Sequence, residues 1–233
     1  MALIFDEQFE TDPGYDETWT GGETEDTGCS LDPDQATSVA GSPPAWDSLC
    51  LYADVDGSQG DHAYVAGDLV DLSDEADTWL KIEFVCLANG LDTAGNIGRL
   101  LVVKDSAALL AYRVLLANDG GTFKIGLATK LNGVDVTTYY SDAISVNRIY
   151  RVEVKWETTK DLFEWRVNGV QQDAAALTGN HALGIDSITS LGLIAVSAGK
   201  DLTVAIDNVQ IDDAGWVIAH SLIIGGNTYI ARP

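Results

Sequence analysis

The sequence predicts an all-β protein, either an antiparallel two-sheet β-sandwich or a jelly roll. Apolar and polar residues alternate with period two in many short stretches, and glycine, asparagine and aspartate separate these stretches. Helical periodicity is almost absent. The 233 residues, 46% of them hydrophobic, suffice for a full core. We expect one sandwich domain over residues 1–213 and a separate apolar segment over 214–233.

The clearest pair of predicted strands is 150–157 and 162–167. Tyr150, Val152, Val154 and Trp156 share one face of the first strand, and charged residues occupy the other face. A short connection joins the two strands, and an Asn-Gly pair follows the second. This pattern is typical of a hairpin with one buried and one solvated face.

Ten further stretches show the same kind of pattern, which brings the prediction to about a dozen strands. Such a number, with hairpin-scale gaps, favours two packed sheets over a uniform barrel. The stretch 12–44 is the least regular, and we expect an acidic excursion there. The ten predicted strands are 3–9, 48–55, 62–69, 79–87, 98–104, 109–117, 122–128, 134–140, 188–197 and 202–211.

Three segments resemble the concanavalin A-like lectin/glucanase group, including laminin-G-like modules. They are the opening Phe5-Asp6-Glu7-Gln8-Phe9-Glu10 followed by Trp19, the central hairpin that ends at Asn168-Gly169, and the closing strand with Ile206-Asp207-Asn208-Val209. The resemblance covers residues 3–212. It implies a jelly-roll fold and a lectin-like role.

The net charge of −23, from 36 acidic and 13 basic side chains, argues against nucleic acid and membrane surfaces as partners. The first 80 residues contain no lysine or arginine. A solvated acidic surface that keeps the protein in solution explains this composition. Divalent cations or a basic partner explain it as well.

The phase of acidic residues in the first and last strands suggests a calcium site. Glu7 lies in phase with Phe5 and Phe9, and Asp207 lies in phase with Val209. An inward carboxylate needs a partner, and the resemblance implies a structural calcium held by Glu7, Glu10 and Asp207. The alternative is a bulge near Asn208 that resets the phase. A second acidic stretch, 54–61, reads as a hairpin turn.

Glycan binding would use exposed aromatic rings. Trp19 and Trp46 lie in or beside the acidic excursion, and Tyr139 and Tyr140 are adjacent, so one of that pair should face outward. These four are the candidate glycan or partner contacts. Packing in the core or anchoring of loops is the alternative role for each.

Catalysis has no support in the sequence. Sugar-cleaving members of the resembled group carry clustered carboxylates, whereas Glu153, Glu157 and Glu164 alternate here with lysine and arginine. A cross-strand charge ladder accounts for that composition. We therefore expect a protein that is not an enzyme.

The tail lacks acidic side chains after residue 213, and its Gly-Gly-Asn stretch predicts a final hairpin. This hairpin either closes an edge of the sandwich or forms an assembly arm that adds to a neighbour. The candidate arm residues are Trp216, Ile218, Leu222, Ile224 and Tyr229.

These observations predict a non-catalytic interaction protein of an assembly. A decoration or tail-associated protein of a virus or phage fits best, with glycan-binding capacity and self-association as further expectations. The chain begins without a recognisable signal segment, so we expect cytoplasmic synthesis and a final position on a virion or extracellular surface. The alternatives are a carbohydrate-binding module of a secreted protein and a glycoside hydrolase or polysaccharide lyase.

Overall fold

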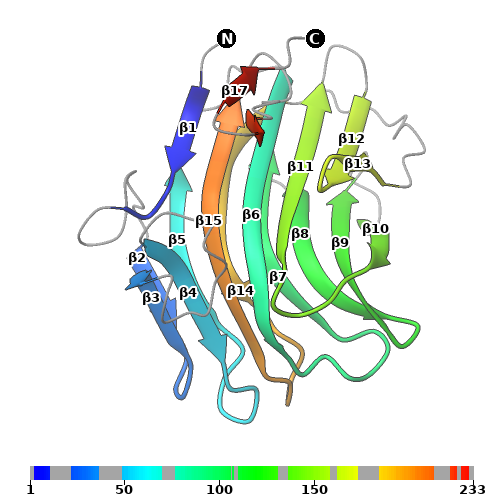
Figure 1. The fold of residues 1–233 in the computed structure, drawn as a ribbon. Helices are drawn as coiled ribbons and strands as arrows, with labels where there is room; N and C mark the ends of the chain where they lie inside the picture. Colours follow the sequence, from blue (N-terminus) through cyan, green and yellow to red (C-terminus); the bar gives the residue numbers. More distant parts are fainter. Residues whose placement is uncertain are drawn as a thin grey trace.

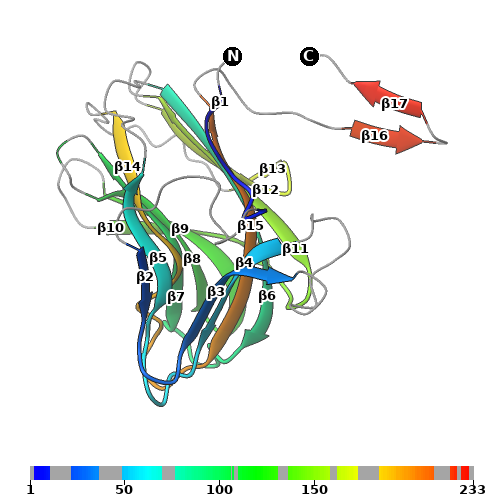
Figure 2. The same cartoon turned by 90° about the vertical axis from the view of Figure 1, so that its left-hand side faces the viewer.

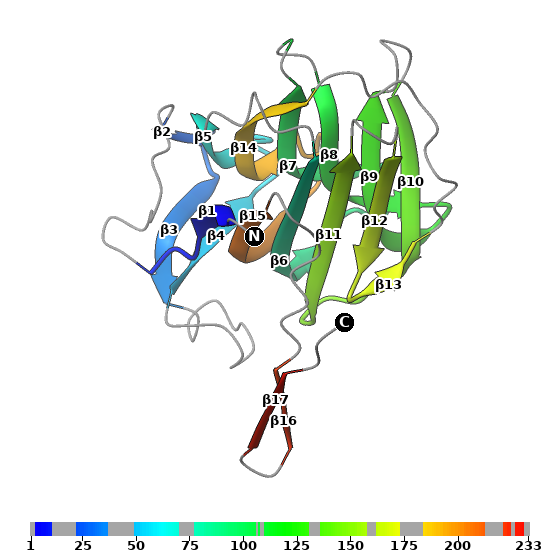
Figure 3. The ribbon, with the colours of Figure 1, turned by 90° about the horizontal axis from the view of Figure 1, so that it is seen from above.

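The computed structural model describes residues 3–10, 22–36, 49–69, 77–105, 107, 110–130, 136–157, 162–172, 184–212, 221–224 and 227–230. Two antiparallel sheets of eight and seven strands pack face to face (Figures 1 and 3). The prediction of an all-β sandwich is therefore confirmed. Within the described ranges no helix is long and apolar enough to cross a membrane.

The eight-stranded sheet has the order β13-β12-β11-β6-β15-β4-β3, and β1 also pairs with β15. Both β4 and β1 use the same edge of β15, β4 along residues 202–206 and β1 along residues 209–212. The strands are β1 (Leu3–Glu7), β3 (Ser30–Ala36), β4 (Leu49–Val55), β6 (Asp77–Asn89), β11 (Ile149–Glu157), β12 (Leu162–Val167), β13 (Val170–Gln171) and β15 (Leu202–Asp212).

The seven-stranded sheet has the order β10-β9-β8-β7-β14-β5-β2. Two further strands, β16 (Ser221–Ile224) and β17 (Asn227–Ile230), pair only with each other and lie outside both layers (Figure 2). The seven strands are β2 (Gly22–Glu25), β5 (Ala63–Leu69), β7 (Ile97–Asp105), β8 (Leu110–Asp119), β9 (Thr122–Lys130), β10 (Val136–Ala143) and β14 (Ile185–Ile194).

Each of the twelve predicted sandwich strands is present, but β2 and β3 lie inside the stretch expected to be irregular. Both are edge strands. Glu23 and Glu25 of β2 are exposed, so no apolar alternation marks the strand. Pro33 interrupts β3 where its register with β4 shifts, which is the position an edge strand tolerates.

Aromatic rings from both sheets meet in the core. Tyr112 on β8 packs against Trp156 on β11 and Phe163 on β12, with ring centroids 5.8 and 5.7 Å away. Trp156 and Phe163 meet edge to face at 5.4 Å. All three side chains are buried. The inward face predicted for 150–157 is thus the face that closes the sandwich.

The outer face of the eight-stranded sheet carries paired charges. Glu153 lies opposite Arg166 and Lys155 opposite Glu164 across β11 and β12. The charge ladder expected for this hairpin therefore has the register it requires. It continues onto β6, where Glu83 Oε1 accepts a hydrogen bond of 2.8 Å from the Nε–H of Arg151.

A β-bulge in β15 explains the odd phase of its acidic residue. Asn208 has a φ of 52°, and the register with β6 shifts between Asp207 and Gln210. The bulge lies where the neighbour of β15 changes from β4 to β1. Beyond it, Val209 returns to the core, whereas Asp207 keeps the outward phase of Ala205. Of the two alternatives, the bulge is correct.

Candidate functional site

The outer face of the seven-stranded sheet is organised in two rows that cross several strands. Strand register aligns the first row from β10 to β14 and the second row from β10 to β5. The first row is Tyr140, Gly126, Leu115, Arg99 and Ile194, and the second is Thr138, Ala128, Arg113, Val102, Ser190 and Ala66. Neither row contains a carboxylate.

An apolar strip, whose central side chains are buried, runs along this outer face. Leu115, Ala117 and Ala128 form a cluster separate from the main core, and Ile97 and Tyr140 pack against it. Gly126 lies within the strip, and a Cβ there would come 2.5 Å from the Leu115 side chain. The absence of a side chain at Gly126 therefore leaves room for the side chain of Leu115.

Arg99 and Arg113 sit within this face. Both are half-buried, and their Nε atoms are buried without a hydrogen-bond partner among the described residues. Burial lowers the pKa of Arg113, and the neighbouring charge of Arg99 lowers it further. The two arginines lie on neighbouring strands, with Arg99 opposite Leu115, two residues along β8 from Arg113.

The adjacent residues Tyr139 and Tyr140 face opposite sides of β10. Tyr139 packs against the main core, and burial raises the pKa of its phenol. Tyr140 is the outward ring, and Lys124 Nζ lies 6.0 Å from its centroid. Lys124 also forms an ion pair of 2.8 Å with Asp119.

A hollow of about 340 Å³ adjoins Tyr140 at the edge of the sandwich. Its lining brings β10 together with β13 of the opposite sheet and is rich in polar side chains, including Lys124, Asp142, Gln171 and Gln172. Gln172 is held in place, because its Nε2 donates to Val170 O at 2.8 Å. The apolar strip therefore ends in a pocket with amide and ammonium groups.

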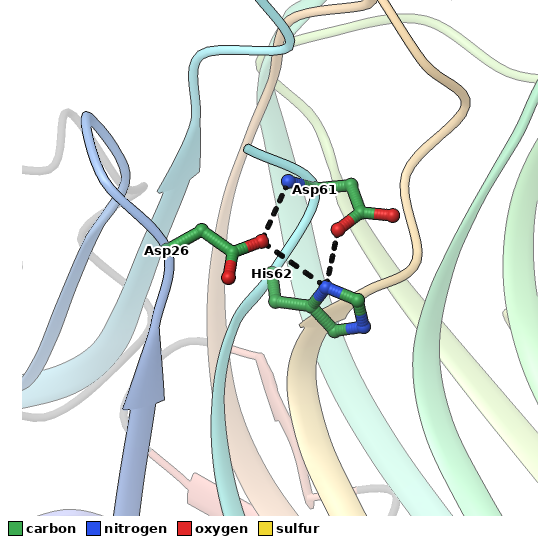
Figure 4. Close-up of side chains that lie close together, drawn as sticks. All are labelled: Asp26, Asp61 and His62. Atoms are coloured by element: carbon green, nitrogen blue, oxygen red, sulfur yellow. Dashed lines mark hydrogen bonds and ion pairs between the residues drawn. The ribbon is translucent and has the colours of Figure 1, made fainter. Parts of the chain in front are cut away.

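Asp26, Asp61 and His62 form a second cluster at the turns between strands (Figure 4). Asp26 follows β2, and the other two residues precede β5. Asp26 Oδ2 accepts the Asp61 backbone N–H at 2.9 Å and lies 3.2 Å from His62 Nδ1, which also contacts Asp61 Oδ1. The hydrogen bond from the Asp61 backbone is the main cause of a lowered pKa at Asp26.

The acidic stretch 54–61 forms the hairpin turn that the sequence predicts. Asp56 O accepts the backbone N–H groups of Gln59 and Gly60 at 2.9 and 3.1 Å. The Asp56 side chain accepts a further bond of 3.0 Å from Ser58 N. The turn explains these residues, while Asp61 joins the cluster with Asp26 and His62.

The three carboxylates proposed for calcium do not converge. Glu7 points into the core, fully buried, and its Oε1 accepts the Phe9 N–H at 3.0 Å. Glu10 accepts the Leu49 N–H at 2.8 Å, and Asp207 lies on the other face of the sheet from Glu7. Among the described residues, only Asp26, Asp61 and His62 bring three metal-ligating atoms within 4.8 Å of one another.

Two of these carboxylates, Glu10 and Asp207, instead lie near a cysteine on β4, together with Asp32. Burial, together with the charges of Asp207, Asp32 and Glu10, raises the pKa of Cys50 to about 12. Cys50, Cys29 and Cys86 are all free thiols.

Several predicted site residues lie outside the described part of the chain, namely Trp19, Trp46, Trp216 and Ile218. The remaining arm residues are on the final hairpin, where Leu222 is opposite Tyr229 and Ile224 is opposite Asn227.

Sequence reasoning missed both Arg99 and Arg113. A signal was present, because Arg113 is the single charged residue in the otherwise apolar stretch 109–117. It also missed the pairing of Asp26 with His62, which depends on the contact between β2 and β5. No periodicity marks that contact.

No family model and no curated protein matches the chain. Solved structures match the chain, and these matches show that it has the concanavalin A-like jelly-roll fold. The cellulose-induced protein Cip1 matches with a TM-score of 0.56 and 11% identity over 90% of this chain and 97% of that one. The binding domain of Paraclostridial Mosquitocidal Protein 1 matches with a TM-score of 0.58 and 16% identity, over 91% of this chain and 48% of that one. A double-cysteine variant of the alginate lyase A1-II' matches with a TM-score of 0.50 and 12% identity, over 71% of this chain and 80% of that one.

Proposed function

We propose that this protein is a non-catalytic glycan-binding domain that binds its ligand on the outer face of the seven-stranded sheet. The observation that carries the proposal is the contrast between the two outer faces. One carries charged residues placed opposite residues of the other sign, as with Glu153 and Arg166, beside a small buried apolar cluster around Cys50. The other has no carboxylate in its two rows, and its outward tyrosine, Tyr140, packs against buried apolar side chains.

The groups on this face suit a sugar chain. Sugar rings stack their apolar C–H faces on aromatic rings, and Tyr140 offers such a ring beside small residues. Thr138 and Ser190 add hydroxyl groups on the second row, and the hollow beside Tyr140 adds the amides of Gln171 and Gln172. This combination of an apolar surface with a few polar groups is typical of carbohydrate sites.

The absence of carboxylates from both rows supports a binding role over glycoside hydrolysis, which needs two acidic groups across the scissile bond. The solved structures of this fold include a lyase and the binding domain of a mosquitocidal protein, as their names state. A place on a virion or in another assembly stays a prediction from the sequence. The feature that motivates this prediction is the hairpin β16–β17.

Replacing Tyr140 by alanine tests the binding face. On a panel of neutral and acidic polysaccharides, we expect Tyr140→Ala to weaken binding by about tenfold or more, since loss of a stacking ring costs roughly 1–3 kcal/mol. Calorimetry or affinity electrophoresis would measure it. The control is Tyr52→Ala, which removes a half-buried tyrosine from the outer face of the other sheet.

Equal losses in the two variants, or no binding to any polysaccharide, would contradict this function. Turnover would contradict the non-catalytic part. Ultraviolet absorbance of unsaturated products would reveal a lyase, and new reducing ends would reveal a hydrolase.

We also propose the cluster of Asp26, Asp61 and His62 as the cation site of the domain, in place of the carboxylates suggested by the sequence. The three ligand atoms lie within 4.8 Å of one another. One of them is an imidazole nitrogen, and a mixed nitrogen and carboxylate set suits zinc better than calcium, which prefers oxygen ligands alone. A bound ion would tie β2 to the start of β5.

Removal of metal tests this site. We expect EDTA to lower the melting temperature by roughly 5–10 °C and zinc to restore it, because an ion at about 100 times its Kd stabilises by about 2.7 kcal/mol. Asp26→Asn should abolish the response, and Asp56→Asn in the adjacent turn should keep it. A melting temperature that EDTA leaves unchanged, with no zinc uptake at equilibrium dialysis, would show a hydrogen-bonded cluster only.

A further inference from the structure

Two arginines lie in the middle of the proposed binding face without an acidic partner among the described residues. Arg99 on β7 is opposite Leu115 and Ile194, and Arg113 on β8 is opposite Val102 and Ala128. All four neighbours are uncharged. Neither arginine has an ion pair with any residue in the described ranges.

Arg99 and Arg113 lack acidic partners among the described residues, whereas several basic side chains elsewhere in the molecule have them. The chain has 36 acidic side chains for 13 basic ones. Elsewhere, bases lie against acids, as in the pair of Arg151 with Glu83 at 2.8 Å and that of Lys124 with Asp119 at 2.8 Å. Carboxylates are therefore abundant, yet none is placed on the two rows that hold Arg99 and Arg113.

This arrangement is unfavourable in the free protein. The Nε–H of each arginine is buried without a hydrogen bond to any residue that the structure describes, which costs free energy because water no longer solvates the group. Burial and, after it, the nearby charge of Arg99 lower the pKa of Arg113, so the free protein disfavours the charged form of this side chain. An anion placed between the two guanidinium groups would relieve both penalties.

We propose that Arg99 and Arg113 form a subsite that binds the carboxylate groups of an acidic glycan, a chain that contains uronic acid residues. The proposal rests on the proposed function and specifies its ligand class. A guanidinium presents two parallel N–H donors that match the two oxygens of a carboxylate. The sugar ring would lie on the apolar strip next to Tyr140, so that ring and carboxylate are recognised on the same rows.

The net charge of the protein helps to distinguish binding at the arginine pair from general electrostatic attraction. A protein with a net charge of −23 repels a polyanion at long range, so general electrostatic attraction cannot account for binding. Salt screens that repulsion, and the Debye length is about 10 Å at 0.1 M. Binding to the arginine pair should consequently survive moderate salt.

The experiment compares two forms of one polymer, polygalacturonate and its fully methyl-esterified counterpart, which differ in charge but share a backbone. We expect the full chain to bind the acidic form at least about tenfold more tightly, which corresponds to about 1.4 kcal/mol. Arg99→Gln and Arg113→Gln should each remove this preference. Arg113→Lys, which keeps the charge but loses the paired donors, should retain part of it.

The matched control is Arg148→Gln, which removes the same charge from an exposed position in the turn before β11. It should leave the preference unchanged. Melting temperatures give a second readout. Without ligand, Arg113→Gln should melt at or above the temperature of the parent protein, because a desolvated charge and a repulsion are lost. Polygalacturonate should raise the melting temperature of the parent and not that of a variant that combines Arg99→Gln with Arg113→Gln.

Two results would overturn the proposal. If both forms of the polymer bind equally, with binding that depends on Tyr140, the face binds glycans but Arg99 and Arg113 do not select charge. If the acidic form is preferred and the glutamine variants keep that preference, the carboxylates bind elsewhere. Failure to bind any polysaccharide would overturn the glycan-binding function as well.

Discussion

Phe163→Ala should cost about 3–5 kcal/mol of unfolding free energy, the largest loss we expect from any single truncation. Phe163 is fully buried, and its ring meets Trp156 at 5.4 Å and Tyr112 at 5.7 Å. It therefore joins β12 to the opposite sheet. Truncation would leave a cavity lined by two rigid rings in strands that are held by their neighbours, so collapse around the cavity would be incomplete.

Denaturant unfolding followed by tryptophan fluorescence would measure this loss, because Trp156 and Trp165 lie in the same core. Phe163→Leu is the control, since it keeps most of the volume and should cost much less. A loss below about 1 kcal/mol for the alanine variant would contradict the tight packing of this aromatic cluster. Native proteins have only about 5–15 kcal/mol of stability in total, so the alanine variant should be close to unfolding.

Strand positions could be predicted from the sequence where burial on one face imposes alternation. In β11, Val152, Val154 and Trp156 are buried, and the pattern alone located the strand. The sequence pattern did not predict edge strand β2, because its residues, Gly-Glu-Thr-Glu, include no apolar side chain to bury. Its place in the sheet is set by hydrogen bonds to β5, which sequence periodicity does not report.

The site was harder to predict, because it depends on register between strands that are distant in sequence. Arg99 and Arg113 become neighbours only when β7 and β8 pair with a shift between Arg99 and Leu101. The calcium hypothesis was wrong for a similar reason, because it depended on which way side chains point along β15. The phase of Asp207 suggested an inward carboxylate, and the left-handed backbone at Asn208 reversed that conclusion. Asparagine tolerates this conformation, so the residue type was a signal for the bulge.

Gly57→Ala should destabilise the protein by roughly 1–3 kcal/mol through a clash between two turns. Gly57 lies in the turn between β4 and β5, and a Cβ there would be 2.2 Å from Lys200 N and 2.3 Å from Lys200 O. Gly199 N also donates to Gly57 O at 3.0 Å, so the two backbones are held together. Because backbone atoms cannot rotate away, relief would require one turn to move.

Gly95→Ala separates this steric effect from backbone strain. Gly95 has a φ of +90°, and a Cβ there would meet nothing within 4 Å, so its substitution costs only the left-handed conformation. Melting temperatures of both variants would be compared. We expect Gly57→Ala to lower it by roughly 2–4 °C per kcal/mol lost, and to lower it further than Gly95→Ala does. A milder effect at Gly57 would mean that the turns beside Asp61 and His62 are not in backbone contact. In that case the contact between the turns would not fix the positions of Asp61 and His62 relative to Asp26.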